Sequence, residues 1–534
     1  MRFHAVLLTA IFVAAVARAE TKPASAPSKE PTASATAAAP HLTTEQILQE
    51  INSLNPYQTP SLDLKTDQEY AHIRDIRQEY VPFGQFGAEP YKKHFLKQIE
   101  YTGPGRAIPE PEEVKTVKIG FIGPIYPTVS VATGGKSHEE VLGLKMLQGC
   151  QLAIEEANAR GGYLKRKIPF ELVVHNDSAL WGASGNEIVR MNYDDKCWAI
   201  LGSIDGANSH IAIRVALKAE ILIVNTADTD PTYIETNIPW TCRVIGDDRQ
   251  MSYLLADYIF DRLKLKRIGI IRASNRYGRF GVRQVRESSR RRGTPIRVEM
   301  AYRVGGEDFS VELNRLKQAE VDGVVHWGDA TDGARILNQM RALGMQQPFF
   351  CCDRCLSDEF VKVAGKNLDD RVVCASPWDP TRTDEKLQQL RETFRKRFPR
   401  QETATSSYNT ADPGAAPDWH RLLAVGGPDV ETYAAHAYDG MNLLIWAIQA
   451  AGLNKAKIRD MIAYRTEPWP GVTGDIRFSS VLDDIGEVYL AKRENGLWKY
   501  YSREMLGLKR HEDSGAKPQL EILNPNLEIR NKSQ

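Results

Sequence analysis

The chain has 534 residues, of which 42% are hydrophobic and 26% charged, enough apolar material for two or three domains with buried cores. Its 69 Lys and Arg residues balance 68 Asp and Glu residues and leave a formal net charge of +1. This balance excludes a protein that binds nucleic acid or an anionic membrane through its overall charge.

The first residues have the pattern of a secretory signal. Arg2 supplies the positive start, residues 5–17 form an apolar core, and Ala17-Arg18-Ala19 is a small-x-small cleavage site. The apolar core is too short to span a bilayer comfortably, and an uncleaved anchor is the alternative to a cleaved signal. We therefore expect a signal peptide at residues 1–19 and export of the mature chain. No later segment is apolar enough to cross a membrane.

Two segments separate this signal from the main body. Residues 20–40 are rich in Ala, Pro, Ser and Thr, with scarcely an apolar anchor, which predicts a disordered linker. Residues 41–114 alternate short charged helical pieces with turns marked by Pro and Gly. This N-terminal extension has too little apolar patterning to fold alone, so we expect it to pack across the main body. An arm that docks a partner is the functional alternative.

From Val117 onward, apolar runs alternate with amphipathic stretches as strands alternate with helices in α/β proteins. The first series predicts strands that begin at Val117 and that cover 170–175, 198–201, 221–224 and 242–245, with helices over 149–160 and 185–193 and another between 209 and 221. The second series predicts strands over 267–272, 296–301, 323–327, 348–351 and 372–375, with helices over 281–292, 309–319 and 333–343. Two successive series of similar size predict two similar lobes, not one long sheet.

The last part of the chain has a different order of elements. Long helices with apolar faces are predicted over 385–398 and 432–451, interrupted by a surface insertion over 401–428 that is full of Ser, Gly, Pro and Ala. Two strands over 487–492 and 497–501 meet at Glu494-Asn495-Gly496, which is typical of a hairpin turn. A polar tail over 509–534 completes the chain.

Two polar loops follow neighbouring predicted strands, at 203–209 and 225–231. Ligands bind at the carboxyl ends of strands in open α/β sheets. Hydroxyl groups, small residues and a free helix N-terminus suit a carboxylate or another small anion. The alternative is an ordinary pair of strand-to-helix turns.

Seven cysteines suit an exported chain, and the odd count leaves at least one thiol unpaired or bonded between chains. Four of them are close in sequence, at Cys351, Cys352, Cys355 and Cys374. Four thiolates suffice for zinc, but the spacing matches no standard two-plus-two zinc pattern, so a disulfide across adjacent loops is favoured over a metal.

Several local strings, in order, resemble one known family: the type I periplasmic solute-binding proteins of the leucine/isoleucine/valine-binding kind, which feed ABC importers. The resemblance covers roughly residues 117 to 501. It rests on the opening strand at 118–124, the first helix at 149–162, Ala227-Asp228-Thr229-Asp230-Pro231 in place of Ala-x-Thr-Asn-Pro, Tyr277-Gly278, and Ala437-Tyr438-Asp439.

The resemblance implies an α/β fold of two Rossmann-like lobes joined by three crossings, here near Ile245, Ala375 and Gly471. Lobe 1 would comprise residues 115–245 and 376–470, and lobe 2 residues 246–375 and 471–508. Ligand binds between the lobes and favours the closed form, because only the closed form contacts it on both sides.

The resemblance also implies the roles of individual residues. The ligand carboxylate would be held by the loop containing Gly206, Asn208 and Ser209, together with Ala227 and Thr229. The ammonium would lie near Asp353, and Tyr277 of lobe 2 would pack against the ligand. Hydroxyl and amide donors suit a carboxylate, and a desolvated carboxylate suits an ammonium. The alternative for Asp353 is an exposed loop acid beside a disulfide.

The sequence departs from the family pattern in the same region. The family's serine in the first loop aligns with Gly206, with Asn208 or Ser209 as substitutes. An aromatic pair of lobe 2 is replaced by Asp329 and Ala330. The ligand class therefore stays open between an amino acid, a short amide, urea and another small carboxylate.

The motifs of known enzyme classes match the sequence less well. Gly135-Lys136-Ser137 lacks the earlier glycine of a phosphate-binding loop, because Ser130 stands there. His138-Glu139 begins like a zinc-protease helix, but Leu142 stands where the second histidine ligand belongs, and no G-x-S-x-G occurs. The resemblance implies a monomeric periplasmic protein without cofactor or catalytic activity, which delivers a small molecule to an ABC permease. A ligand-sensing or partner-docking periplasmic subunit is the alternative.

Overall fold

The computed structural model describes residues 99–508, except 126–127, 130–136, 139–140, 179, 237, 292–293, 400–429 and 480. The predicted signal peptide, the linker, most of the N-terminal extension, the insertion at 401–428 and the tail at 509–534 lie outside the described residues. No helix in the described ranges is long and apolar enough to cross a membrane.

The first lobe is built on a five-stranded sheet with the order β4-β1-β5-β6-β7, in which all neighbours are parallel. Parallel neighbouring strands must be joined by crossover connections, which are usually helices. Helices accordingly follow β1, β4 and β5. The strands are β1 (Val117–Gly123), β4 (Phe170–Asn176), β5 (Ala199–Leu201), β6 (Leu222–Asn225) and β7 (Thr241–Arg243), and a separate short ribbon joins β2 (Thr128–Val129) to β3 (Ser137–His138).

Apolar side chains of β1 alternate between the two faces of the strand, which explains how both faces of this sheet are covered. Val117, Ile119 and Phe121 enter one buried cluster, whereas Ile122 enters another on the opposite face. Successive side chains of a strand point to opposite faces, so a strand covered on both faces is apolar throughout. At Gly120 a methyl group would lie 2.8 Å from the Met191 sulfur, so the Met191 side chain packs closely against the backbone of β1.

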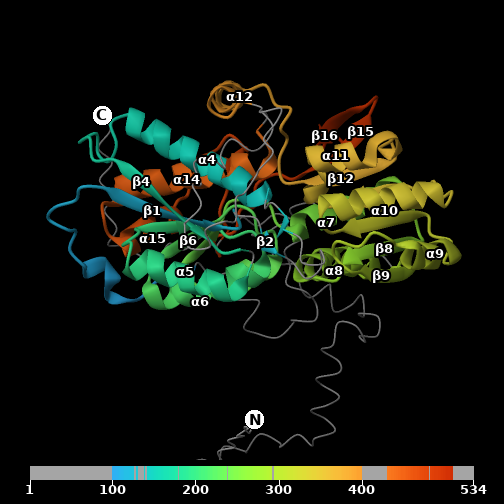
Figure 1. The fold of residues 1–534 in the computed structure, drawn as a ribbon, viewed down its shortest axis with the longest axis horizontal. Helices are drawn as coiled ribbons and strands as arrows, with labels where there is room; N and C mark the ends of the chain where they lie inside the picture. Colours follow the sequence, from blue (N-terminus) through green and yellow to red (C-terminus); the bar gives the residue numbers. More distant parts are fainter. Residues whose placement is uncertain are drawn as a thin grey trace, which may run out of the picture. The chain divides into compact units, whose positions relative to one another are not determined.

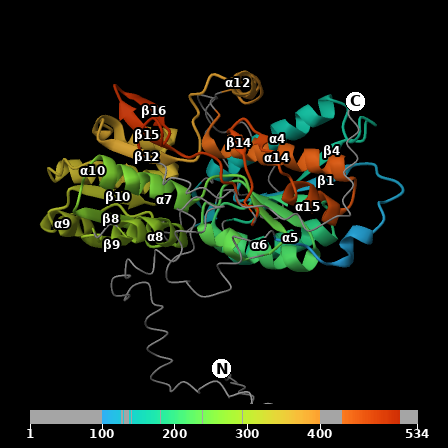
Figure 2. The ribbon, with the colours of Figure 1, turned by 180° about the vertical axis from the view of Figure 1, so that it is seen from behind.

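Helices from distant parts of the chain cover the two faces of the first sheet (Figure 1). On one face α4 packs against α14, and on the other α5 packs against α6. Figure 2 shows the orange α14 and α15 lying with the blue-green strands, so this lobe is completed by the C-terminal part of the chain. The helices are α4 (Val141–Ala159), α5 (Trp181–Tyr193), α6 (Gly206–Ala219), α12 (Glu385–Arg397), α14 (Thr432–Ala451) and α15 (Lys455–Ala463), with a 3-10 turn η4 (Pro231–Thr236).

The second lobe is built on a seven-stranded sheet with the order β16-β15-β12-β11-β10-β8-β9. The strands from β9 to β12 are parallel, and β15 and β16 extend the edge as an antiparallel hairpin. The hairpin turns through Asn495 and Gly496, both at positive φ (51° and 77°), as a two-residue turn requires. The strands are β8 (Ile268–Ala273), β9 (Val298–Tyr302), β10 (Gly323–Trp327), β11 (Phe349–Cys351), β12 (Val372–Ser376), β15 (Tyr489–Glu494) and β16 (Leu497–Tyr501).

Helices of the second lobe pack in pairs, α7 against α8 and α10 against α11. They are α7 (Asp248–Ala256), continued by a wider turn η5 (Asp257–Arg262), α8 (Arg276–Arg291), α9 (Ser310–Gln318), α10 (Ala330–Ala342) and α11 (Asp358–Ala364), with short turns η6 (Asp353–Cys355) and η7 (Gly365–Asn367). The two lobes have separate apolar cores, which confirms the predicted α/β fold of two lobes.

The chain passes between the lobes after β7, after β12 and before β15. The third passage is later than the resemblance implied. Val472, Ile476 and Leu482 pack in the core of the first lobe, and the Leu482 carbonyl accepts from the Arg243 amide at 3.0 Å. A small ribbon of β13 (Trp469–Pro470) and β14 (Asp475–Ile476) therefore belongs to the first lobe, and the chain crosses between Leu482 and β15.

The described end of the N-terminal extension packs on the first lobe, as expected for this segment. Tyr101 contacts Trp240 edge-to-face, with ring centroids 4.8 Å apart. The 3-10 turn η3 (Pro104–Ala107) lies against α15, where Arg106 donates to the Asp460 carboxylate at 2.6 Å. The Asn454 side chain caps α15 and also donates to the Gly105 carbonyl at 2.9 Å.

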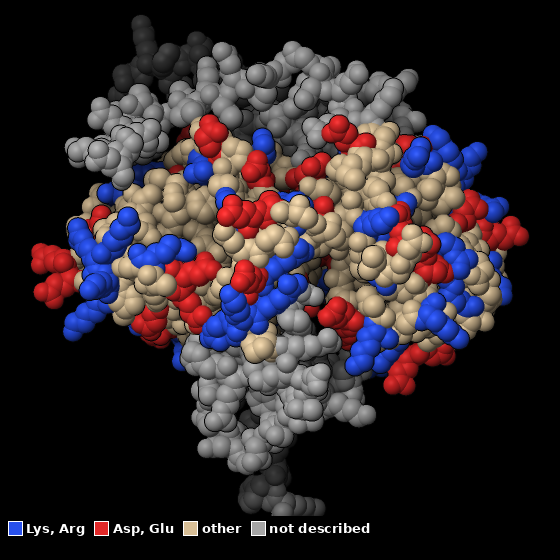
Figure 3. All heavy atoms as spheres, turned by 90° about the horizontal axis from the view of Figure 1, so that it is seen from above, with Lys and Arg blue, Asp and Glu red and all other residues tan. Residues whose placement is uncertain are grey.

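Acidic and basic side chains are interspersed over the described atoms of the face in Figure 3. This mixture agrees with the net charge of +1. A surface of mixed sign has no extended field that would attract a polyanion to this face.

Helix starts are where prediction and structure differ most. The sequence predicted helices beginning at residues 149, 281 and 333, whereas α4, α8 and α10 begin at Val141, Arg276 and Ala330. The first turns of α8 and α10 are polar or contain glycine, so apolar periodicity begins only later in these two helices. Helices α7, α11 and α15 were not predicted, and each of them begins after a side-chain cap.

Candidate functional site

The two polar loops of the first lobe lie side by side, because they follow the adjacent strands β5 and β6. Gly206 is the first residue of α6, and the preceding Asp205 does not cap the helix with its side chain. The N-terminal N–H groups of α6 therefore lie in the first loop, close to the segment that follows β6.

Three of the residues predicted to bind the ligand carboxylate are hydrogen-bonded within the first lobe. Asn208 donates to the buried Asp177 carboxylate at 2.9 Å. Ser209 accepts from the Asn225 amide at 3.1 Å, and the Ala227 N–H donates to the Asn225 side-chain oxygen at 2.9 Å. These contacts hold the shape of the two loops, and the structure does not bring these groups together around one open point.

Gly206 lies against an ion pair that joins the lobes. Arg276, the first residue of α8, donates to Asp230 at 2.7 Å and to Thr232 at 2.7 Å, and it lies 3.0 Å from His210. A Cβ at position 206 would lie 2.6 Å from the Asp230 carboxylate and 2.9 Å from the Arg276 Nε. Glycine at position 206 thus makes room for a carboxylate from the chain itself.

Two of the other predicted residues, Tyr277 and Asp353, also meet where the lobes are in contact. Tyr277 donates to one oxygen of Asp353 at 2.8 Å, and Tyr433 donates to the other at 2.7 Å. Tyr277 and Asp353 belong to the second lobe, whereas Tyr433 lies in the first turn of α14 in the first lobe. Asp353 is only 3% exposed, so it is not the exposed loop acid of the alternative interpretation.

Asp248 is a second buried carboxylate at this point. Its backbone N–H donates to the Thr229 carbonyl at 2.8 Å, which places the loop after β6 against the start of α7. Neither side-chain oxygen meets a hydrogen-bond donor at normal geometry among the described residues. Burial and then the negative charge of Asp353 hold the pKa of Asp248 well above its usual value, with the neighbouring Thr229 hydroxyl acting in the opposite direction.

Burial likewise raises the pKa of Asp353, while the Tyr433 and Tyr277 hydroxyls and the Arg354 charge oppose the shift. Two carboxylates in one buried place repel each other, and a cation between them would favour the ionised form of both. A cation close to both carboxylates would therefore be stabilised by both of them.

Arg354 forms a second bridge between the lobes. Its guanidinium donates to Asp205 of the first lobe at 2.9 Å and to Asp329 of the second at 2.7 Å. It also stacks over the Tyr277 ring at 3.8 Å. Arg354 thus connects the loop before α6 to the second lobe, Arg276 connects the segment after β6 to it, and the structure shows the lobes in contact.

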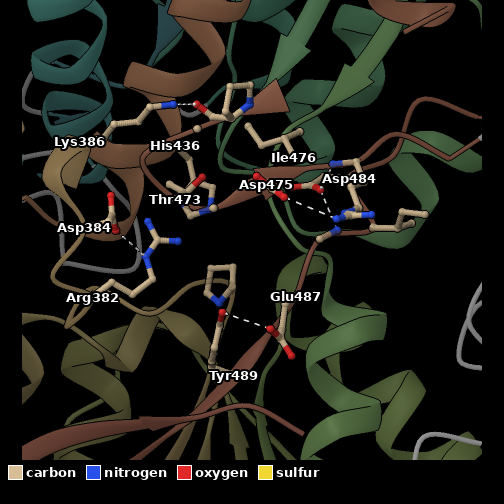
Figure 4. A pocket seen from close by; sticks show the side chains of 17 residues that line it. Arg382, Asp384, Lys386, His436, Thr473, Asp475, Ile476, Asp484, Glu487 and Tyr489 are labelled. Carbon is tan, nitrogen blue, oxygen red and sulfur yellow. Dashed lines mark hydrogen bonds and ion pairs between the residues drawn. The ribbon is translucent and has the colours of Figure 1, made fainter. Parts of the chain in front are cut away.

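A cavity of about 810 Å³ lies elsewhere, where the second and third passages between the lobes approach α12 and α14 (Figure 4). Its wall carries both signs of charge, and its basic groups have partners: Arg382 lies 3.2 Å from Asp384, and Lys386 donates to the Pro470 carbonyl at 3.1 Å. None of the predicted ligand residues lines this cavity.

The structure therefore divides the predicted ligand-binding residues into two groups. Thr229, Tyr277 and Asp353 come together with Asp248 and Tyr433, whereas Gly206, Asn208, Ser209 and Ala227 shape the loops of the first lobe. The doublet Asp247-Asp248 after a buried strand was a usable signal for a functional carboxylate. Tyr433 had no such signal, because an aromatic residue in an apolar helix is typical of core packing.

Replacing Arg276 with Gln is expected to favour an open arrangement of the lobes. The charged hydrogen bonds from Arg276 to Asp230 and Thr232 would be lost, at a cost to the closed form of about 1.5 kcal/mol, or about tenfold in the closed-to-open ratio. Energy transfer between dyes on the two lobes measures this ratio in the ligand-free protein. Arg279→Gln is the matched control, because Arg279 lies on the same helix and, in the part of the chain that the structure describes, its side chain donates to the Ser274 carbonyl of its own lobe. An unchanged distance distribution for Arg276→Gln would contradict the role of this bridge.

Comparisons with known proteins agree with this architecture. Residues 116–416 match the family model described as periplasmic binding protein. Leu/Ile/Val-binding protein homolog 2 of Brucella abortus is 24% identical over 392 residues, which cover 70% of this chain and 96% of that protein. Leu/Ile/Val-binding protein homolog 1 of Brucella suis is 25% identical over 363 residues, which cover 67% of this chain and 88% of that protein.

Two solved structures show that the fold is shared. The branched-chain amino acid transporter substrate-binding protein LivJ of Streptococcus pneumoniae, in complex with isoleucine, superposes with a TM-score of 0.58 at 20% identity, over 73% of this chain and 100% of that one. A solute-binding protein of an ABC transporter from Rhodopseudomonas palustris, in complex with 3,4-dihydroxybenzoic acid, gives a TM-score of 0.58 at 16% identity, over 73% of this chain and 96% of that one.

Proposed function

Since this chain belongs to the periplasmic binding protein family, we propose that it captures a small polar ligand between its two lobes and delivers it to an ABC importer in the inner membrane. The family consists of binding proteins, and in this role the chain needs no catalytic group. We further propose that residues 1–19 direct export to the periplasm and are cleaved after Ala19, and that the mature protein acts as a monomer.

The observation that supports this function best is the arrangement around Asp353. Its two oxygens are held by tyrosines from opposite lobes, at 2.8 and 2.7 Å, so contact with this carboxylate depends on closure. The nearby Asp248 carboxylate is buried, and no donor among the described residues meets it at normal hydrogen-bond geometry. We assign the ammonium group of the ligand to these two carboxylates, with Thr229, Tyr277 and Tyr433 around it.

This arrangement supports an ammonium-bearing ligand, in the first instance an amino acid. The site offers fewer partners to the carboxylate of the ligand, because the Asp230 carboxylate already lies beside Gly206 at the start of α6. We propose that Gly206, Asn208, Ser209 and Ala227 maintain that loop, and that a ligand carboxylate displaces Asp230 from Arg276. An amide or amine of the same skeleton would avoid this competition, which makes the choice between them testable.

A thermal-shift screen with matched ligands tests the proposal. For each skeleton it compares the amino acid, its amide, the amine without the carboxylate and the acid without the ammonium, with urea as a further compound. A true ligand at a hundred times its dissociation constant should add about 2.7 kcal/mol to the stability of the folded protein. Stabilisation by ammonium-bearing compounds is the expected result. Stabilisation by none of them, or only by acids that lack the ammonium, would overturn the assignment.

A further inference from the structure

A compact group of sulfur and imidazole side chains lies in the second lobe, behind the turn that carries Asp353. His326, Cys351 and Cys374 are register partners on the adjacent parallel strands β10, β11 and β12. Register partners of neighbouring strands point to the same face of a sheet, so these three side chains form a row. Cys355 approaches the row from η6, and all four residues are completely buried.

The group is close enough to share one ion. A nitrogen of His326 and the sulfur atoms of Cys351 and Cys355 all lie within 4.8 Å of one another. The sulfur of Cys355 lies 3.7 Å from the Nδ1 of His326. Cys374 lies beside Cys351 in the register, and Cys352 precedes the turn that ends in Cys355, so two more thiols flank the three.

The His326 ring is oriented as a metal-binding imidazole would be. Its Nε2 lies 3.0 Å from the Tyr302 hydroxyl, which leaves Nδ1 directed at the thiols. The ring is stacked between Tyr302 and Phe349, with centroids 5.8 Å away on each side. Metal-bound histidines characteristically make such a hydrogen bond through the nitrogen that does not face the ion.

The residues around this group of sulfur and imidazole side chains pack closely against it. A Cβ at Gly333 of α10 would lie 2.7 Å from the His326 ring and 3.1 Å from the Cys355 sulfur, so glycine is needed there. Gly333 thus keeps the space beside the His326 ring and the Cys355 sulfur free of side-chain atoms.

The structure contradicts the disulfide favoured from the sequence, because all seven cysteines lie in the described residues and all are free. Exported proteins reach an oxidising compartment, in which disulfides form and persist. A disulfide would also leave the inward-facing His326 nitrogen without a role. Three sulfur atoms and one imidazole form a ligand set that suits a tetrahedral Zn²⁺ ion.

We propose that His326, Cys351 and Cys355 bind a structural Zn²⁺ ion, with the fourth ligand supplied by Cys352 or Cys374. Asp353 and Arg354 lie between Cys352 and Cys355, in the turn that such an ion would anchor. The metal would therefore hold the Asp353 carboxylate in position for the ligand. This consequence rests on the proposed function, whereas the metal site itself does not.

The test uses the full-length exported protein, purified from the periplasm after growth with zinc. Elemental analysis should find about one zinc per chain that survives dialysis, and replacement by Co²⁺ should give the absorption bands of tetrahedral cobalt with thiolate ligands. Cys355→Ser and His326→Gln should each lose the metal. Cys150→Ser, which alters a buried thiol of the first lobe, is the matched control and should keep it.

Single variants at Cys352 and Cys374 identify the fourth ligand, because only the true one should weaken retention in competition with a chromophoric chelator. Competition between the unaltered protein and the chelator tests metal binding even if a variant does not fold. Unaltered protein without bound metal after zinc exposure would overturn the proposal, as would an intact mass showing these thiols oxidised in pairs. If metal binds but its removal leaves ligand affinity unchanged, only the coupling to Asp353 is wrong.

Discussion

Replacing Asp353 with Asn is expected to lower the affinity for an ammonium-bearing ligand by about 100-fold or more. The substitution keeps the size of the side chain but removes the charge that would pair with the ammonium in a buried place. Loss of one partner of a buried, hydrogen-bonded charge pair costs about 2–5 kcal/mol of binding free energy, and about 2.8 kcal/mol corresponds to 100-fold. Isothermal titration calorimetry with the ligand from the matched screen measures the change directly.

Two comparisons separate a binding role from a structural one. Asp358→Asn removes an exposed carboxylate at the start of α11, a few residues away, and should leave affinity unchanged. In the absence of ligand, Asp353→Asn should not lower the stability of the protein, because burial and Asp248 disfavour the charge that is removed. Unaltered affinity in Asp353→Asn would remove this residue from the site.

Replacing Arg243 with Met is expected to destabilise the first lobe by about 3–5 kcal/mol. Arg243 is completely buried on β7 and donates to both oxygens of Asp483, at 2.7 and 2.9 Å, and to Asp247 at 3.1 Å. It also donates to the carbonyls of Asp230 and Asp228, at 2.7 and 3.3 Å. Without the guanidinium, two buried carboxylates lose a partner and the loop after β6 loses its support. Urea denaturation at neutral pH measures the loss.

The control is Arg267→Met, because Arg267 is half exposed and pairs with Asp322 at the surface, at 2.7 Å. Exposed pairs contribute about 1 kcal/mol or less, so this variant should change stability little. Replacing Asp483 with Leu in the Arg243→Met background should recover part of the loss, since it removes one of the stranded charges. A loss below about 1 kcal/mol for Arg243→Met would show that Arg243 does not anchor the third passage between the lobes.

Most elements of the fold were predictable because their signals are local. The apolar run of β1 and the turn at Asn495-Gly496 each depend on residues adjacent in sequence, and both appear as predicted. The helix α7 was missed because the residues from Asp248 to Ala256 are all buried, so no polar face marks a period. The third passage was placed too early because Leu482 contacts β7, and no local pattern reports a contact with so distant a strand.

The candidate site was predictable in part. Tyr277 and Asp353 came from matching short strings to a family, and the structure brings them within hydrogen-bonding distance. The role of Asp230 was not foreseen, because its interaction with Arg276 joins residues of different lobes. Asp248 and Tyr433 were missed for the same reason, since their partners lie far along the chain.

By itself, the sequence determined the two-lobed α/β fold, the family and the two loops at the carboxyl ends of β5 and β6. Periodicity and short motifs are enough for these features, because they depend on neighbours a few positions apart. Three features could be seen only after folding: which side chains of those loops are already bonded, that Asp248 and Asp353 share one buried place, and that His326 joins the cysteines. Strand register and the packing of one lobe on the other set these distances, and both depend on contacts between residues remote in sequence.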